Sequence, residues 1–173
     1  MSTVTTSPTS SHTSTAGGSV AVRSTVNLCT FRLHEFMIGI DVTLVQEVLN
    51  RQAATRIPLV SDVVQGLINL RGEIVTTIDL RRRLGLPLRT PDDPCMNVVI
   101  RTADGPVALA VDTIGDVIDA DESLFEFPPP TLSGPHREFV TGVFKLDESL
   151  LLLIDLDRVL DPSTIKIKTE VPA

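Results

Sequence analysis

The chain has 173 residues, with 15 Lys and Arg against 22 Asp and Glu, and a formal net charge of −7. It therefore lacks the basic surface of a nucleic-acid-binding protein, and six Phe with no Trp or Tyr offer few rings for stacking bases. The two cysteines, Cys29 and Cys95, form no Cys-x-x-Cys pair, so we expect no metal site. No apolar stretch approaches the ~20 residues of a membrane span, and we expect a cytoplasmic protein without direct membrane insertion.

Both ends of the chain have the composition of tails. Residues 1–25 are rich in Ser, Thr and Gly and hold too little apolar area to offset the entropy of ordering them, which predicts a disordered segment. Residues 163–173 are expected to form a second, C-terminal tail. The folded part is therefore expected to cover residues 26–162.

Short apolar runs separated by turn residues predict strands within this folded part. The runs cover residues 28–33, 36–42, 74–78, 98–101, 107–111 and 149–154. The first two flank His34-Glu35 and predict a hairpin, and Asp104-Gly105 is a strong signal for a second hairpin. Strands that are this short and closely spaced favour β-barrels or a sandwich.

The chain contains an internal repeat. Residues 64–84 match residues 140–160 without a gap, and the matched pairs include Gly66 with Gly142 and Ile78-Asp79-Leu80 with Ile154-Asp155-Leu156. Weaker upstream matches join Ile40-Asp41 to Val111-Asp112, and residues 45–49 to residues 114–118. The repeat predicts two related halves, at about 27–88 and 96–161, joined by a turn-rich linker at 87–94.

Each half ends with a strand, an aspartate and a short polar turn. Asp79 and Asp155 are expected to be N-caps that accept hydrogen bonds from the free amides of short helices, and Gly85 suits the left-handed residue that closes the first helix. A remote alternative is a two-lobed aspartic hydrolase that uses this pair of carboxylates. That class needs Asp-Thr/Ser-Gly in each lobe, whereas Leu follows both aspartates here, so capping is favoured.

The search for other catalytic arrangements finds none. His34 and His136 fall in predicted turns and are expected to be solvated, and residues 81–83 form an arginine run that is typical of an exposed helix face. No Ser/His/Asp arrangement, nucleophile elbow or phosphate-binding glycine loop is visible. We therefore predict a protein that is not an enzyme and needs no cofactor.

Several motifs resemble one family. Residues 66–87, with Asn-Leu-Arg-Gly at their start, closely resemble the central motif of CheW proteins, and residues 36–48, 111–118 and 139–147 resemble other family segments. The resemblance implies an all-β fold of two five-stranded Src-homology-3-like β-barrels that share a hydrophobic interface, with short helical turns. It also implies a non-catalytic adaptor that couples the cytoplasmic tips of chemoreceptors (methyl-accepting chemotaxis proteins) to the regulatory domain of the histidine kinase CheA.

The resemblance also implies a receptor groove between the barrels. Carried over by position, the groove would use Val42, Val45, Glu47, Asn69, Arg71 and Ile114. For Val42 and Val45, packing in the core is as plausible as contact with a receptor. The structural motif of the two copies is expected to comprise Gly66, Gly72, Asp79, Gly142 and Asp155. An alternative within the same family is a scaffold in a chemosensory pathway that controls motility or development rather than chemotaxis.

Overall fold

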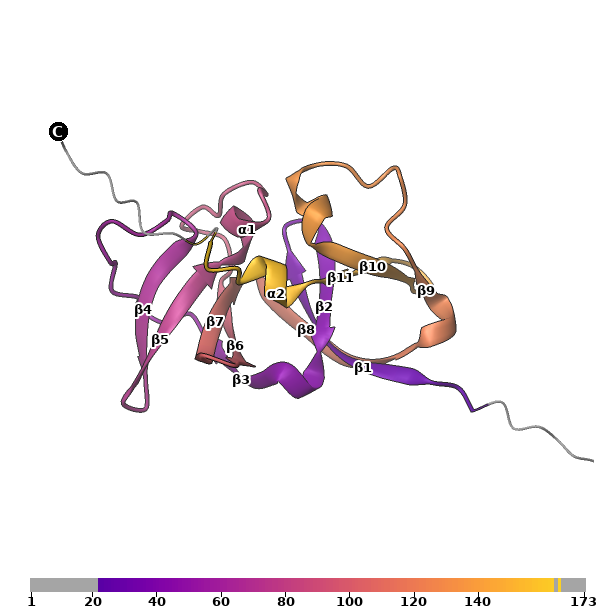
Figure 1. Cartoon of the computed structure of the whole chain (residues 1–173), viewed down its shortest axis with the longest axis horizontal. Coiled ribbons are helices and arrows are strands. Elements are labelled where there is room, and N and C mark those ends of the chain that lie inside the picture. Colours follow the sequence, from indigo (N-terminus) through magenta and orange to yellow (C-terminus); the bar gives the residue numbers. More distant parts are fainter. Residues whose placement is uncertain (1–21, 164, 166–173) are drawn as a thin grey trace, which may run out of the picture.

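The protein forms two β-sheets that lie side by side in a computed structural model, which describes residues 22–163 and residue 165 (Figure 1). The six-stranded sheet has the order β8-β1-β2-β11-β10-β9. Its strands are β1 (Thr25–Leu33), β2 (Phe36–Asp41), β8 (Thr113–Asp121), β9 (Phe125–Glu126), β10 (Val140–Lys145) and β11 (Leu150–Ile154). The predicted 1–25 tail lies outside the described residues up to residue 21, and β1 already begins at Thr25.

The second sheet has five strands in the order β3-β6-β7-β5-β4. Its strands are β3 (Val45–Asn50), β4 (Val64–Leu70), β5 (Glu73–Asp79), β6 (Met96–Thr102) and β7 (Gly105–Val111). Short helices connect the strands: η1 (Val42–Leu44), α1 (Leu80–Arg83), η2 (Glu122–Leu124), η3 (Pro135–Phe139) and α2 (Leu156–Val159). The all-β prediction is confirmed, although the first sheet has a sixth strand because the two-residue β9 pairs with β10.

The two sheets do not coincide with the two halves of the repeat. The β1–β2 hairpin of the first half pairs with β11 and β8 of the second half, and the β6–β7 hairpin of the second half pairs with β5 and β3 of the first. The first hairpin of each half thus belongs to the sheet that contains the remaining strands of the other half. The parallel pairs β2–β11 and β5–β7 are the contacts that make this exchange.

The strand registers correct one detail of the repeat. The two hairpins have turns of equal length, so Leu28 on β1 corresponds to Asn97 on β6. Leu28 lies opposite Asp41, and Asn97 lies opposite Ala110, so Asp41 corresponds to Ala110. The match of Ile40-Asp41 to Val111-Asp112 was therefore wrong by two residues. The apolar identity at those positions was too weak to fix the register, which the hairpin turns set instead.

The main hydrophobic core lies at the junction of the two sheets. Buried side chains from both sheets meet there, among them Phe31, Ile40, Ile78, Leu109, Val111 and Ile154. Each sheet also has a smaller core of its own, around Leu28 and Leu151 in one and around Val75 and Val99 in the other. Burial of aliphatic groups at about 25 cal/mol per Å² is the main stabilising term, so the junction is expected to hold the two sheets together as one folding unit.

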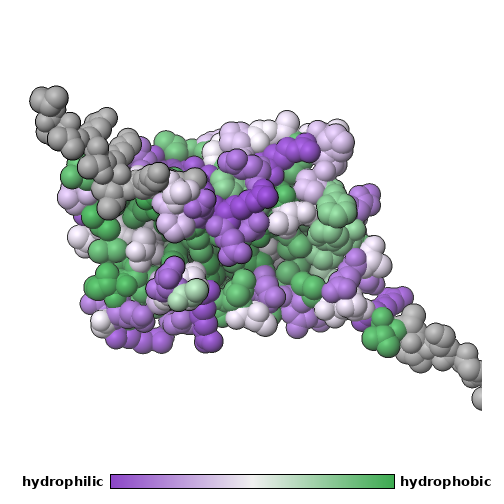
Figure 2. All heavy atoms as spheres, viewed as in Figure 1, coloured by the Kyte–Doolittle hydropathy of each residue, from purple (hydrophilic) through white to green (hydrophobic). Residues whose placement is uncertain are grey.

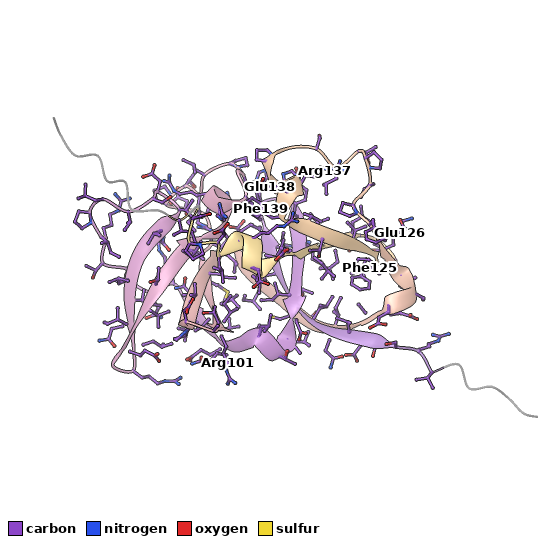
Figure 3. All side chains as sticks on the ribbon, in the orientation of Figure 1. Arg101, Phe125, Glu126, Arg137, Glu138 and Phe139 are labelled. Atoms are coloured by element: carbon purple, nitrogen blue, oxygen red, sulfur yellow. The ribbon has the colours of Figure 1, made fainter. Side chains whose placement is uncertain are left out.

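Two paired glycines lie where β4 and β10 bulge. The register shifts between Val64 and Gly66 in the first copy, and between Val140 and Gly142 in the second. A Cβ atom at Gly66 would approach the carbonyl oxygen of Thr55 to 2.5 Å. A Cβ atom at Gly142 would collide with the ring of Phe125, which packs edge-on at the outer end of the six-stranded sheet (Figure 3).

Candidate functional site

The β4–β5 hairpin presents one arginine at a tight turn. Arg71 and Gly72 have φ angles of 52° and 87°, so both lie in the left-handed region, as in the two-residue turns that suit the twist of a hairpin. Asn69 Oδ1 accepts a hydrogen bond from the Gly72 N–H at 2.8 Å, which holds the turn. Asn69 and Gly72 thus fix the backbone that carries Arg71.

Arg71 forms an ion pair that joins the two edges of the five-stranded sheet. Its Nη2 lies 2.8 Å from Glu47 Oε2, and the side chains are 79% and 17% exposed respectively. Glu47 belongs to β3, the opposite edge of the sheet from β4, and an isolated bridge joins Thr55, in the segment after β3, to Leu67 on β4. The sheet therefore curls into an incomplete barrel, and Glu47 holds the guanidinium while leaving most of it open to solvent.

The three apolar residues implied by the resemblance lie at the junction. Val42, Val45 and Ile114 are half-buried, and each packs against the main core cluster. Val45 pairs with Ile100 on β6, and Ile114 pairs with Phe31 on β1, so the two occupy equivalent positions in the two copies. Packing against the core is therefore confirmed for both valines, and their contact with a receptor stays a prediction.

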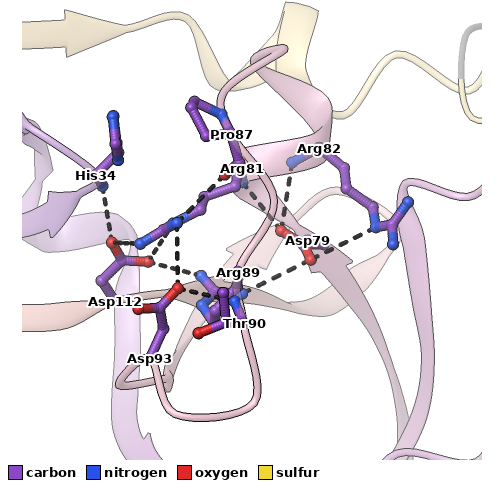
Figure 4. A network of polar contacts seen from close by, with 9 residues as sticks. All are labelled: His34, Asp79, Arg81, Arg82, Pro87, Arg89, Thr90, Asp93 and Asp112. Carbon is purple, nitrogen blue, oxygen red and sulfur yellow. Dashed lines mark hydrogen bonds and ion pairs between the residues drawn. The ribbon is translucent and has the colours of Figure 1, made fainter.

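A buried network of charges was not predicted. Arg81 is only 6% exposed, and its Nε and Nη2 donate to the two carboxylate oxygens of Asp112 at 2.8 and 2.5 Å (Figure 4). The expectation that the arginine run forms an exposed helix face was therefore wrong for Arg81. Asp112 also accepts the backbone N–H of His34 at 2.7 Å, which ties the β1–β2 hairpin to the end of β7.

The linker between the two halves is anchored in the same network. Arg89 is 7% exposed; it donates to Asp112 Oδ1 at 2.9 Å and lies 3.6 Å from Asp79 Oδ2. Asp93 lies 3.6 Å from Arg81 Nη1. Arg89 and Asp93 were missed because a turn-rich linker has no periodicity to mark an inward residue, and only the fold shows which carboxylates surround them.

These contacts decide the protonation of Asp112. Burial by itself raises the pKa of the Asp112 carboxyl, but the hydrogen bonds from Arg81, His34 and Arg89 outweigh burial and lower the pKa below its ordinary value. The hydrogen bond to Asp112 in turn raises the pKa of Arg81. The site therefore holds a fixed carboxylate between two cations, which is the geometry of a structural anchor rather than of a proton donor.

Arg83 is the second arginine of the run that turns inward. Its guanidinium lies 4.7 Å from the ring centroid of Phe139 and donates to the carbonyls of Val159 and Arg158, both at 2.6 Å. The carbonyls belong to α2, so Arg83 links the two short helices across the junction. Of the three arginines only Arg82 is exposed, as the run predicted.

The two aspartates of the hydrolase hypothesis serve their own helices. Asp79 Oδ1 accepts from the N–H groups of Arg81 and Arg82 at 3.0 and 3.3 Å. Asp155 Oδ1 accepts in the same way from the N–H groups of Asp157 and Arg158, at 3.0 and 3.2 Å. The carboxylates end strands of different sheets, and each is engaged as an N-cap, so the structure gives no support to a shared-proton pair.

Two further searches concern metals and membranes. Over residues 22–163 and 165, no group of three or more His, Cys, Asp and Glu side chains is arranged to hold a metal ion. Among the helices in that same part of the chain, none has the length and apolar character that would carry it across a bilayer.

Comparison with known proteins places this fold in one family. The profile of the CheW-like domain matches residues 27–163. The chain is 36% identical over 123 residues to the chemotaxis protein CheW of Bacillus subtilis, covering 71% of this chain and 79% of the relative. It is 30% identical over 136 residues to that of Treponema pallidum, covering 76% and 80%. The crystal structure of the scaffolding protein TtCheW from Thermoanaerobacter tengcongensis superposes with a TM-score of 0.72 at 29% identity, covering 80% of this chain and 94% of that one. The chain belongs to the CheW family.

Proposed function

We propose that the chain is a non-catalytic chemotaxis adaptor that couples the tips of chemoreceptors to the regulatory domain of the histidine kinase CheA. The observation that supports this most strongly is the pairing of a CheW fold with a rigidly presented, largely exposed Arg71. An adaptor needs surfaces that exist before binding, since ordering flexible groups would reduce the affinity. Through these partners it is recruited to receptor arrays at the membrane.

The receptor contact would combine apolar anchors with one charged group. Val42 and Val45 supply apolar area on η1 and β3, and Ile114 supplies the equivalent position on β8. Arg71 can donate several hydrogen bonds to receptor carboxylates or carbonyls, and its pairing with Glu47 limits the entropy lost on binding. Apolar side chains then give most of the affinity, and the guanidinium sets the register of the receptor tip.

The kinase contact is proposed to use a different face of the first barrel, which is the one formed by the five-stranded sheet. The regulatory domain of CheA is itself CheW-like, so the two proteins would meet through related barrels. Separate faces would let one chain hold a receptor and a kinase together, which is what coupling requires. A scaffold in a pathway for motility or development remains a second form of the same function, and the identity of the captured receptor would distinguish them.

The first prediction tests the receptor contact with Arg71→Ala. We expect binding of a purified receptor-tip fragment to weaken by about 1–3 kcal/mol, as on loss of a charged anchor. The free energy of unfolding should change by less than about 1 kcal/mol, because the lost ion pair is exposed. Alanine and arginine are both disfavoured at the positive φ of position 71, so the substitution should change the backbone strain little. Titration calorimetry and urea unfolding on the same preparation measure both quantities.

The matched control is Arg137→Ala. Arg137 is an exposed arginine on η3 whose Nη1 donates to the carbonyl of Leu132 at 2.9 Å, within its own loop (Figure 3). We expect it to bind the receptor fragment like the parent, and both variants to bind the kinase domain normally. Normal receptor binding by Arg71→Ala would remove this residue from the site. Loss of both partners in a folded Arg71→Ala protein would show that the two sites are not separate.

A further inference from the structure

An apolar groove of about 680 Å³ lies between the five-stranded sheet and the C-terminal part of the chain around α2. Figure 2 shows apolar atoms recessed near the middle of this face, between more polar groups. Its apolar lining includes Leu44, Ile78, Ile100, Val107, Leu160 and Ile165. None of the six residues proposed for receptor binding lines this groove, so the groove adjoins the proposed receptor site at Leu44 without sharing its residues, and the proposed function leaves it without an occupant.

The C-terminal segment of the chain begins at this groove. Ile165 lines the groove, packs against the main core cluster and donates its backbone N–H to the carbonyl of Asp161 at 3.3 Å. Residues 166–173 follow it directly and lie outside the described residues. A segment that starts inside a groove has a short tether to it, and short tethers give effective concentrations in the millimolar range. A sub-millimolar intrinsic affinity is therefore enough for occupancy.

The sequence of the segment matches the chemistry of the groove. Ile165 and Ile167 alternate with Lys166 and Lys168, a period of two that places the isoleucines on one face of an extended chain. The charged residues that line the groove are Arg101, Asp104 and Asp157, two acids and one base, with Arg101 at its lower edge (Figure 3). Long lysine side chains can reach such acids while the adjacent apolar groups stay buried.

We propose that residues 166–173 dock in this groove of their own chain, with Ile167 against the apolar lining and Lys166 and Lys168 toward Asp104 and Asp157. The docked segment covers apolar surface that the two sheets leave open beside η1. It also places basic side chains next to acidic ones in a protein whose net charge is −7. The proposal concerns the chain alone and does not depend on the proposed receptor or kinase partners.

The test compares methyl resonances of the full chain with those of the full-length variant Ile167→Asp. An aspartate in place of Ile167 puts a charge against the apolar lining, so docking should be lost. The resonances of Ile100, Val107 and Leu160 should then shift, while those of Leu28 and Leu151, in the separate core of the six-stranded sheet, stay in place. The matched control is Pro172→Asp, which adds the same charge at a position on the opposite face of an extended segment.

A synthetic peptide of residues 165–173 completes the experiment. Added to Ile167→Asp, it should return the lining resonances toward those of the parent with a Kd on the order of 0.1–1 mM, the range that a short tether makes sufficient. Raising the salt from about 50 mM to about 500 mM should weaken this binding several-fold, because the lysine contacts are screened. Unchanged lining resonances in Ile167→Asp would overturn the proposal. So would equal shifts in Pro172→Asp, or parent shifts that depend on protein concentration and so report docking onto a second copy.

Discussion

At the scale of single residues, the carboxylate of Asp112 accepts four hydrogen bonds from three residues. It accepts hydrogen bonds from Arg81, Arg89 and the backbone of His34, and so joins β7, α1, the linker and the first hairpin. The cap at Asp79 could be predicted from the sequence, because a cap depends only on the next few amides. The inward turn of Arg81 could not, because its partner lies 31 residues away and only the fold brings the two together.

The second prediction follows from that network. Asp112→Asn keeps the shape of the side chain but removes the nearest carboxylate from two buried guanidinium groups, so we expect the free energy of unfolding to fall by about 3–5 kcal/mol. Asp116→Asn is the matched control, because Asp116 is an exposed aspartate on β8 whose loss should cost less than about 0.5 kcal/mol. Urea unfolding of the three proteins at neutral pH measures both values.

The acid dependence of stability tests the same residue. The folded-state pKa of Asp112 is lower than its ordinary value of 3.8, so its stabilising effect is complete above that value. The effect is lost as the pH falls through the folded pKa, because the folded protein must then take up a proton that the unfolded chain already holds. The Asp112→Asn variant should therefore lose less of its free energy of unfolding than the parent as the pH falls through this range. An acid profile parallel to that of the parent would show that Asp112 is not the group responsible.

At the scale of the elements, the two short helices are built alike but stabilised differently. Asp79 and Asp155 cap α1 and α2 through the same pair of amides, as the repeat predicted. Asp79 is also paired with the buried Arg89, whereas Asp155 has only the exposed Arg158 within its own helix. The two caps are therefore a natural pair for separating the effect of capping from the effect of the charge network.

The third prediction uses this difference. Asp155→Ala should reduce the free energy of unfolding by about 1 kcal/mol, the usual cost of losing an N-cap. Asp79→Ala should cost more, because a buried arginine also loses a carboxylate. Thermal and urea unfolding of both variants provide the comparison. Equal losses would mean that Arg89 draws its stabilisation from Asp112 alone.

The exchange of hairpins shows where prediction from the sequence ended. The strands, the turn at Asp104-Gly105 and the repeat itself follow from local patterns of apolar and turn residues. The sheet that each hairpin joins cannot be predicted from such patterns. The two copies have a similar alternation of apolar and polar residues, so either hairpin could complete either sheet. The ion pair between Arg71 and Glu47, which draws the two edges of the incomplete five-stranded barrel together, also spans 24 residues and depends on the fold.

At the scale of the whole molecule, the exchange explains how two small barrels can serve as a rigid adaptor. Each sheet contains strands from both halves, and the main core lies where the sheets meet. Relative movement of the barrels would separate the parallel pairs β2–β11 and β5–β7 from the core that covers them. A receptor contact at the junction and a kinase contact on the first barrel would therefore be held at a fixed distance.

A coupling adaptor must hold a receptor and the kinase at the same time. The most direct measurement is a titration of a receptor-tip fragment into the chain that is already saturated with the regulatory domain of CheA, followed by light scattering of the mixture. We expect a complex that contains all three proteins, with the same receptor affinity as the chain has without the kinase domain. Displacement of the kinase domain by the receptor fragment, or binding of only one of the two partners, would contradict it.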